Sequence, residues 1–445
     1  MLRACLRLCA LAALVLAPLL PAGAAPPAID RKGLDALAVA WAKARPKSKF
    51  DAWDPKARAE ILEKAKALGP IPEGALEEVR DVLWKALRKE WPKTDGKMTT
   101  PYGPATWIQN GKGGPKAGLV VGLHGGGDGA GDASEAAGKW RLPGCLHMYP
   151  QGIKLVHDTW NTVHGERFVL TLLEHAKVQH EVDPDRVFTM GFSMGGTGSW
   201  FFAGRHPDLL AGSAPCAGVL MASPKSQVWH KEDVQELQYG FVPNVRNLPM
   251  YWFIGLADDH CMPGTFLYAH DQLEALCKAD PTGYTQQEFA TYEGLGHAFP
   301  PGEPSKLLSW IAPKRRDALP KKLVWEVAGS PYPLPEDDTD RKVARYVKED
   351  FYWLHYDRPA DHAYTTATLD GNTIALSLST GFPEDWTIWL KPKILDVTKE
   401  VVVTVDGKEV YRGLPVPDVL TVLETLDSRV DRTLTFDRRI RLAKN

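Results

Sequence analysis

The chain has 445 residues, of which 44% are hydrophobic and 24% are charged. This composition is ordinary for a soluble globular protein, and the length predicts two or three folded units. The formal net charge at pH 7 is −2 and there is no long basic run, which argues against nucleic acid or an anionic membrane surface as a partner.

Residues 1–24 have the pattern of an export signal. Arg3 and Arg7 precede the apolar stretch from Ala10 to Leu20, and Ala22-Gly23-Ala24 offers small residues for cleavage. A stretch of about 11 apolar residues is too short to span a bilayer, which needs about 20. The sequence therefore predicts a cleaved signal peptide, a secreted or periplasmic protein, and no stable membrane span.

Residues 25–96 are rich in Ala, Lys, Glu and Leu at helical spacing, which predicts a helical N-terminal region. From 97 to 318, apolar strands alternate with amphipathic helices, the pattern of a mostly parallel, doubly wound α/β sheet. The expected strands cover 105–108, 119–123, 146–149, 187–192, 212–216, 251–255 and 287–292, and the expected helices cover 166–179, 195–204, 265–278 and 305–311. The stretch 223–247 interrupts this rhythm and is either a lid or a surface insertion.

A glycine run follows the second of these strands, in Leu123-His124-Gly125-Gly126-Gly127. A backbone without side chains can turn its N–H groups toward the negative charge that develops on a carbonyl oxygen during acyl transfer. The rival interpretation, a dinucleotide-binding loop, would require a helix to open at this point, and none is evident. Gly125 and Gly126 are therefore predicted to lie in an oxyanion hole.

The stretch from Gly191 to Gly196 reads Gly-Phe-Ser-Met-Gly-Gly and stands between a predicted strand and a predicted helix. A G-x-S-x-G sequence in that setting is a nucleophile elbow, a tight turn that exposes the serine hydroxyl. Ser193 is the predicted nucleophile. The N–H of Met194, at the start of the next helix, is predicted as the second oxyanion donor.

Two later loops supply the partners that this nucleophile needs. Asp258 and Asp259 follow an apolar strand, and His297 follows Gly294-Leu295-Gly296. An imidazole can take the serine proton, and a carboxylate can orient the imidazole. Either aspartate could be the acid. The chain order of serine, acid and histidine is that of α/β-hydrolases.

After Pro320 the pattern changes to short β-branched or alternating runs, with Asp370-Gly371 and Asp406-Gly407 as hairpin signals. Residues 319–445 are therefore predicted to form a β-rich module, joined through a linker at 331–340. Its residues leave open whether it binds a polymer, shields the site or completes the fold.

Six cysteines occur, and Cys5 and Cys9 would leave with the signal peptide. For the four cysteines that remain, the sequence is equally compatible with one disulfide and with four buried thiols. No C-x-x-C motif occurs, and neither a metal nor an organic cofactor is predicted. The four are Cys145, Cys216, Cys261 and Cys277.

About half of the chain resembles the secreted polyhydroxybutyrate depolymerase and feruloyl esterase group of the α/β-hydrolase superfamily. The motifs that carry the resemblance are 123–125, 149–152, Trp160-Asn161, 182–187, 191–196, 206–208, the Gly255-x-x-Asp258 loop and 294–300. The resemblance implies that Ser193 is the nucleophile, His297 the base, and Asp258, ahead of Asp259, the acid. It also places His124, Trp160 and Asn161 near the substrate, with a structural role for Trp160 and Asn161 as the equal alternative.

The sequence as a whole predicts an exported serine esterase that acts through an acyl-serine intermediate. The expected substrates are feruloyl or acetyl esters of polysaccharides, followed by hydroxyalkanoate esters. Two alternatives are a secreted peptidase of the prolyl oligopeptidase type and a non-catalytic protein that uses the hydrolase scaffold to bind a glycan or a surface. The oligomeric state is not predicted.

Overall fold

The structure is a computed structural model that describes residues 28–126, 131–153, 159–220, 222–223, 227–237, 242–327, 348–357, 359–360, 362–379 and 385–443. The predicted signal peptide, the predicted linker at 331–340 and Gly127 lie outside the described residues.

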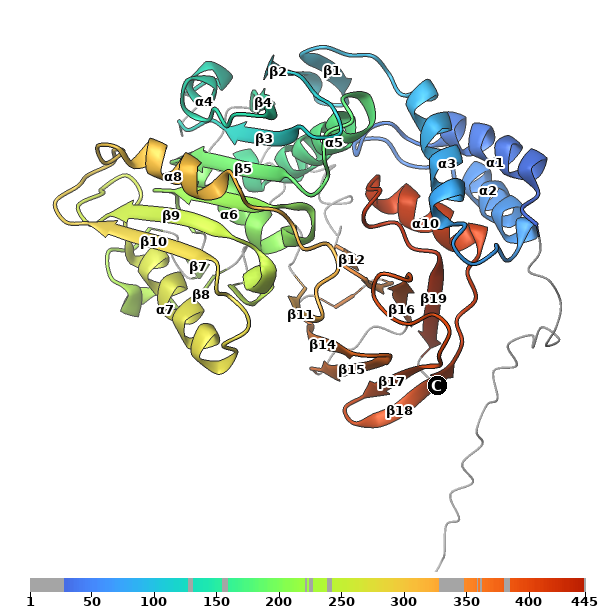
Figure 1. The fold of residues 1–445 in the computed structure, drawn as a ribbon. Coiled ribbons are helices and arrows are strands. Elements are labelled where there is room, and N and C mark those ends of the chain that lie inside the picture. The colour runs from blue at the N-terminus through green and yellow to red at the C-terminus, as the bar shows by residue number, and fades with distance from the viewer. Residues whose placement is uncertain are drawn as a thin grey trace, which may run out of the picture.

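An eight-stranded sheet forms the centre of the fold, on the left in Figure 1. Its strand order is β1-β2-β4-β3-β5-β6-β9-β10. The second strand runs antiparallel to both of its neighbours, and the strands from β4 to β10 are parallel. The strands are β1 (Lys97–Thr100), β2 (Gly103–Asn110), β3 (Gly118–Leu123), β4 (Cys145–Pro150), β5 (Val187–Phe192), β6 (Gly212–Cys216), β9 (Met250–Gly255) and β10 (Gln287–Tyr292).

This strand order, with an antiparallel second strand, is that of the α/β-hydrolase fold, and the predicted fold class is confirmed. Strands β3, β4, β5, β6 and β9 are buried along their whole length, because helices cover both faces of a parallel sheet. The helices of this region are α4 (Ala133–Lys139), α5 (Val163–Gln179), α6 (Met194–Arg205), α7 (Gly264–Ala279) and α8 (Glu303–Ile311).

The strands and helices expected in this region all occur, with ends that differ by at most three residues. Outside the interrupted stretch, β1 and α4 were not anticipated, because both are short and only partly apolar. The interrupted stretch at 223–247 contains a two-stranded sheet of β7 (Ala222–Ser223) and β8 (Glu236–Leu237), with the 3₁₀ turns η3 (Lys231–Asp233) and η4 (Val242–Asn247).

Three N-terminal helices form a bundle with a helix from the far end of the chain (Figure 1). The C-terminal helix carries Val419, Val422, Leu423 and Leu426, and the next residue after it, Val430, into the same apolar core as the N-terminal helices. The helices are α1 (Arg31–Ala44), α2 (Pro55–Leu68), α3 (Leu76–Glu90) and α10 (Val419–Arg429). The sequence analysis did not anticipate a helix within the β-rich C-terminal module.

The rest of that module consists of two sheets that share one core. Trp325, Leu376 and Val403 contribute to this core from the five-stranded sheet, and Leu354 and Ile388 contribute from the four-stranded sheet. The five-stranded sheet has the order β11 (Lys322–Glu326), β14 (Tyr364–Asp370), β15 (Thr373–Leu378), β17 (Val401–Val405) and β18 (Lys408–Gly413), and the four-stranded sheet has the order β12 (Asp350–Phe351), β13 (Leu354–Tyr356), β16 (Asp385–Leu390) and β19 (Arg438–Ala443).

The four cysteines of the described residues are free thiols, three of them buried. Burial raises the pKa of Cys145 to about 11 and raises that of Cys216 well above its usual range, so both side chains remain protonated at neutral pH. Within the described ranges, no helix combines the length and the apolar character needed to cross a bilayer.

Candidate active site

Ser193 occupies a strained turn between β5 and α6. Its φ of 60° and ψ of −126° lie outside the conformations that a residue with a side chain prefers. The backbone holds this turn in place, because the Ser193 N–H donates to the Cys216 carbonyl at 3.0 Å. The side chain does not cap α6, so its hydroxyl is available for chemistry.

The glycines around Ser193 are explained by close backbone packing. A β-carbon on Gly191 would lie 2.1 Å from the Gly195 carbonyl oxygen, and one on Gly195 would lie 2.1 Å from that of Leu123. A β-carbon on Gly196 would lie 2.3 Å from the Cys216 carbonyl oxygen. No real β-carbon fits at such distances, so these three positions require glycine if the elbow is to pack against β3 and β6.

The glycine loop after β3 lies directly against the elbow. A β-carbon on Gly125 would be 3.3 Å from the β-carbon of Ser193, and Gly126 turns the backbone with a φ of 87°. Met194 is the first residue of α6, where N–H groups have no partner within the helix and the helix dipole favours negative charge. The three residues predicted for the oxyanion hole therefore border Ser193.

His124 supports this loop from beneath. Its Nδ1–H donates to the Gly125 carbonyl at 2.8 Å, and its Nε2 accepts from the Gly152 N–H at 3.1 Å. Burial lowers the pKa of His124, which favours the neutral tautomer that these two contacts require. The Trp160 indole N–H donates to the His124 carbonyl at 3.0 Å and holds the same turn.

The structure places the three residues expected near the substrate in a different role. His124, Trp160 and Asn161 are each only 1% exposed, so none offers a surface to a ligand. They pack under the loop that contacts Ser193, and their positions there correct the expectation of direct substrate contact. The side-chain amide of Asn161 has no hydrogen-bond partner among the described residues.

His297 pairs with Asp258. Its Nδ1–H donates to Oδ2 of Asp258 at 2.8 Å, and the carboxylate is fully buried. The other oxygen of Asp258 accepts the backbone N–H groups of His260 at 3.0 Å and Cys261 at 2.7 Å. The neighbouring Asp259 has a side chain that is 74% exposed, so geometry distinguishes the two aspartates that the sequence left open.

The loops that carry this pair are joined through their backbones. The Ala257 N–H donates to the Leu295 carbonyl at 3.0 Å. A β-carbon on Gly255 would lie 2.3 Å from that same carbonyl oxygen, so glycine at this position permits the close approach. The pairing of His297 with Asp258 is therefore built on a rigid connection between the ends of β9 and β10.

His297 contacts the elbow through an aromatic ring. The ring of Phe192, the residue before Ser193, lies 4.7 Å from the His297 ring, measured between centroids. Within the described chain, the Ser193 hydroxyl makes no hydrogen bond, including with His297. A general base must come within about 2.6–3.2 Å of the proton that it takes, and this contact often shortens only when substrate binds.

Several residues around the site escaped the sequence analysis. Phe299 stacks on Phe192 at 4.5 Å, and the Lys139 ammonium lies 5.3 Å from the Phe299 ring centroid. The exposed His260 ring lies 5.1 Å from that of His297. The sequence could have indicated that Phe192 and Phe299 lie near the site, since Phe192 directly precedes Ser193 and Phe299 follows His297 by two residues.

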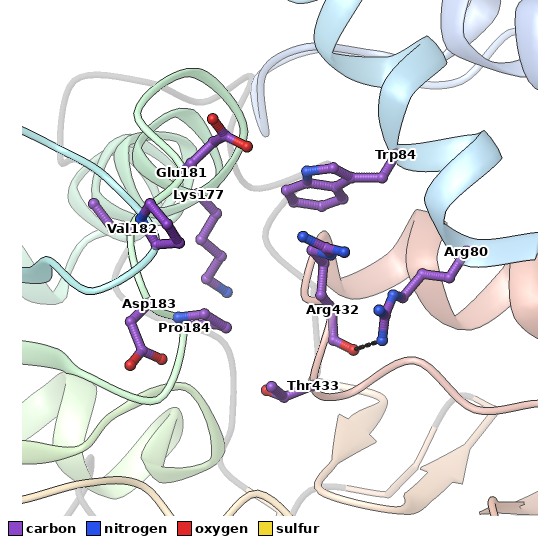
Figure 2. Close-up of a pocket in the computed structure, with 10 residues that line it drawn as sticks. Arg80, Trp84, Lys177, Glu181, Val182, Asp183, Pro184, Arg432 and Thr433 are labelled. Carbon is purple, nitrogen blue, oxygen red and sulfur yellow. Dashed lines mark hydrogen bonds between the residues drawn. The ribbon is translucent and has the colours of Figure 1, made fainter. Parts of the chain in front are cut away.

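A pocket of about 250 Å³ lies at the opposite end of the sheet (Figure 2). Asp183 and Pro184 line it just before β5 begins, whereas Ser193 follows the end of that strand. Lys177 also lines the pocket, but its ammonium is bound to a carboxylate outside the cavity, with 2.8 Å between Lys177 Nζ and Asp431 Oδ2. This pocket lies between the helical bundle and the sheet, and none of the predicted catalytic residues lines it.

Comparisons with known proteins find similarity only at the level of structure. No family model matches the chain, and no curated protein matches its sequence. Solved structures that resemble it include esterase PE8 (15% identity, 46% of this chain and 97% of that one, TM-score 0.34). Others are the acetyl xylan esterase from Aspergillus awamori (17%, 48% and 97%, TM-score 0.35) and the Bacillus cereus carboxylesterase (13%, 46% and 93%, TM-score 0.32). Similarity this distant leaves the function to be inferred from the residues of the chain itself.

Proposed function

We propose that this protein is a serine hydrolase that cleaves carboxylic esters. The observation that carries the proposal is the buried Asp258 bound to His297, next to a strained Ser193 that is bordered by Gly125 and the start of α6. Each part has a role in acyl transfer, and a protein that only binds a ligand would have no use for the combination.

The reaction follows from the proton positions. Asp258 holds the Nδ1–H of His297, which leaves Nε2 free to take the Ser193 proton as Oγ attacks the ester carbonyl. The backbone N–H groups beside Ser193 stabilise the oxyanion, and His297 returns the proton to the departing alcohol. Water then attacks the acyl-serine by the same route in reverse, which releases the acid and restores the serine.

We further infer that the enzyme is exported and that its substrates are esters carried by a polymer. The N-terminal pattern of residues 1–24 supports export. The apolar wall formed by Phe192 and Phe299 beside His297 suits an apolar or aromatic acyl group, such as feruloyl. Acetyl and hydroxyalkanoate esters are the other classes that the proposal includes.

The decisive experiment compares Ser193→Ala with Ser305→Ala, a change at an exposed serine on α8. Ser193→Ala is expected to abolish hydrolysis of 4-nitrophenyl acetate and covalent labelling by a fluorophosphonate, with the thermal midpoint preserved. Ser305→Ala should retain both activities. Labelling of the Ser193→Ala protein at the wild-type rate would refute the assignment of the nucleophile.

A further inference from the structure

The ammonium of Lys139 contacts the same aromatic ring as His297. Its Nζ lies 5.4 Å from the ring centroid of Phe192 and 5.3 Å from that of Phe299, and the Phe192 ring lies 4.7 Å from the His297 ring. Lys139 is the last residue of α4, and the next residue, Trp140, packs against Phe299 at 5.7 Å between centroids. This packing fixes the end of α4 at the site, and the Lys139 side chain is exposed enough for a ligand to reach it.

Glu135, one turn earlier in α4, is the partner of Lys139. The distance between Lys139 Nζ and Glu135 Oε1 is 3.1 Å. A β-carbon on Gly125 would lie 3.8 Å from that Oε1 and 3.3 Å from the β-carbon of Ser193, so the carboxylate stands next to the glycine loop. The pair of Lys139 and Glu135 therefore extends from this loop to the apolar wall, and an exposed pair of this kind contributes little to stability.

The two charged groups of this pair have complementary hydrogen-bonding capacities. An ammonium has three N–H donors and no acceptor, and the contact with Glu135 can use only one of the three. A carboxylate only accepts, whereas a hydroxyl group both donates and accepts. A hydroxyl can therefore accept a hydrogen bond from Lys139 and donate one to Glu135 at the same time.

Other substituents suit the pair less well. A carboxylate on the ligand would be repelled by Glu135. A methoxy oxygen can accept a hydrogen bond from Lys139, but it offers no donor to Glu135. An unsubstituted apolar ring would cover both charged groups without replacing the hydrogen bonds that they make to water. The chemistry of the pair therefore favours a hydroxyl group.

We propose that Lys139 and Glu135 bind a hydroxyl group on the aromatic ring of the acyl group, which makes them specificity-determining residues of the enzyme. The ring itself would lie on the wall formed by Phe192 and Phe299, which reaches from this pair to His297. The proposal rests on the proposed esterase activity and narrows it to esters of hydroxylated aromatic acids, whatever alcohol carries them.

The test compares the methyl esters of 4-hydroxycinnamic, 4-methoxycinnamic and cinnamic acid as substrates of the full chain. Wild type should prefer the hydroxylated ester over each of the others by about ten-fold in kcat/KM, which corresponds to about 1.4 kcal/mol. Lys139→Met retains an unbranched side chain without the charge and should reduce this preference to about one-fold. Glu135→Gln retains an acceptor oxygen without the charge and should reduce the preference to about three-fold.

The matched control is Lys278→Met in α7, which breaks another exposed i,i+4 pair, formed by Glu274 and Lys278. It should keep the wild-type preference, and thermal midpoints should show that all variants are folded. An unchanged preference in both Lys139→Met and Glu135→Gln would overturn the proposal, as would an equal loss of activity on all three esters.

The wild-type protein separates this proposal from the proposed function. Hydrolysis of 4-nitrophenyl acetate without any preference for the hydroxylated ester would overturn the roles of Lys139 and Glu135 and leave the esterase activity in place. A wild type that hydrolyses none of these esters would overturn the proposed function and this extension of it together.

Discussion

At the scale of single residues, the catalytic geometry depends on which of two adjacent aspartates points inward. Asp258 is fully buried and bound to His297, and its second oxygen accepts two backbone N–H groups. Asp259 points outward, and its Oδ1 lies 3.9 Å from Nε2 of His260. The backbone contacts hold Asp258 in place even when no substrate is present.

The pair of variants Asp258→Asn and Asp259→Asn tests this assignment. Asp258→Asn is expected to reduce kcat/KM for 4-nitrophenyl acetate by about 10³- to 10⁴-fold, because an amide cannot stabilise the imidazolium that forms. Asp259→Asn should stay within about three-fold of wild type, as expected for an exposed side chain. A larger loss in Asp259→Asn than in Asp258→Asn would reverse the assignment.

At the scale of elements, an ion cluster ties the start of the four-stranded sheet to α10. His355 on β13 lies 3.0 Å from Asp350 and 3.1 Å from Asp357, and Arg429 of α10 lies 2.9 Å from Asp350. Burial by itself would lower the pKa of His355, but the two carboxylates more than offset this and raise it to about 9. The histidine is therefore charged in the folded protein at neutral pH.

This raised pKa makes stability depend on pH in a defined direction. Because the folded pKa exceeds the unfolded value of about 6.5, the contribution is complete below pH 6.5 and is lost as the pH rises through 9. We expect the free energy of unfolding to fall by about 2–3 kcal/mol from this group between pH 6.5 and 9.5.

Urea unfolding should show that the difference in the free energy of unfolding between wild type and His355→Gln shrinks by this amount across the pH range, because other titrating groups such as Lys391 are common to both proteins. The control His230→Gln, at an exposed position before η3, should keep the wild-type profile. Identical pH profiles for wild type and His355→Gln would show that the ion cluster contributes nothing to stability.

At the scale of the whole molecule, buried ion pairs connect the C-terminal module to the central α/β region. Arg316, which follows α8, lies 2.7 Å from Asp185 and 3.0 Å from Asp431. Asp431, from the C-terminal module, also binds Lys177 of α5. Burial would raise the pKa of Asp431, but Arg316 and Lys177 outweigh it and hold the pKa far below its usual range. The C-terminal module thus supplies the carboxylate that neutralises two buried cations of the central region.

Deletion of residues 319–445 is therefore expected to prevent folding. It would remove Asp431, the carboxylate that Lys177 and Arg316 share, and breaking a buried ion pair costs about 3–5 kcal/mol out of a typical total stability of about 5–15 kcal/mol. It would also remove α10 from the helical bundle. We expect an insoluble product, or one without a cooperative thermal transition.

In the full chain, Asp431→Asn should lower the free energy of unfolding by about 3 kcal/mol. The control Glu400→Gln, whose side chain is 57% exposed, should change it by less than about 0.5 kcal/mol. A soluble deletion product that melts at the wild-type temperature would contradict the view that the module is integral to the fold.

The central sheet and the serine-bearing elbow could both be predicted from the amino-acid order. Buried parallel strands are continuous apolar runs, and the glycines at 191, 195 and 196 are required by backbone packing next to Ser193, so both signals are local. The order of serine, acid and histidine along the chain could likewise be recognised without a structure.

Tertiary structure decided what depends on residues far apart in the chain. The choice of Asp258 required the position of His297, and the burial of His124 and Trp160 required the packing of α6. The partnership of α10 with the N-terminal helices required the whole chain to fold. Amphipathic periodicity shows that a face will be buried, but the surface that covers it is set only when distant elements pack together.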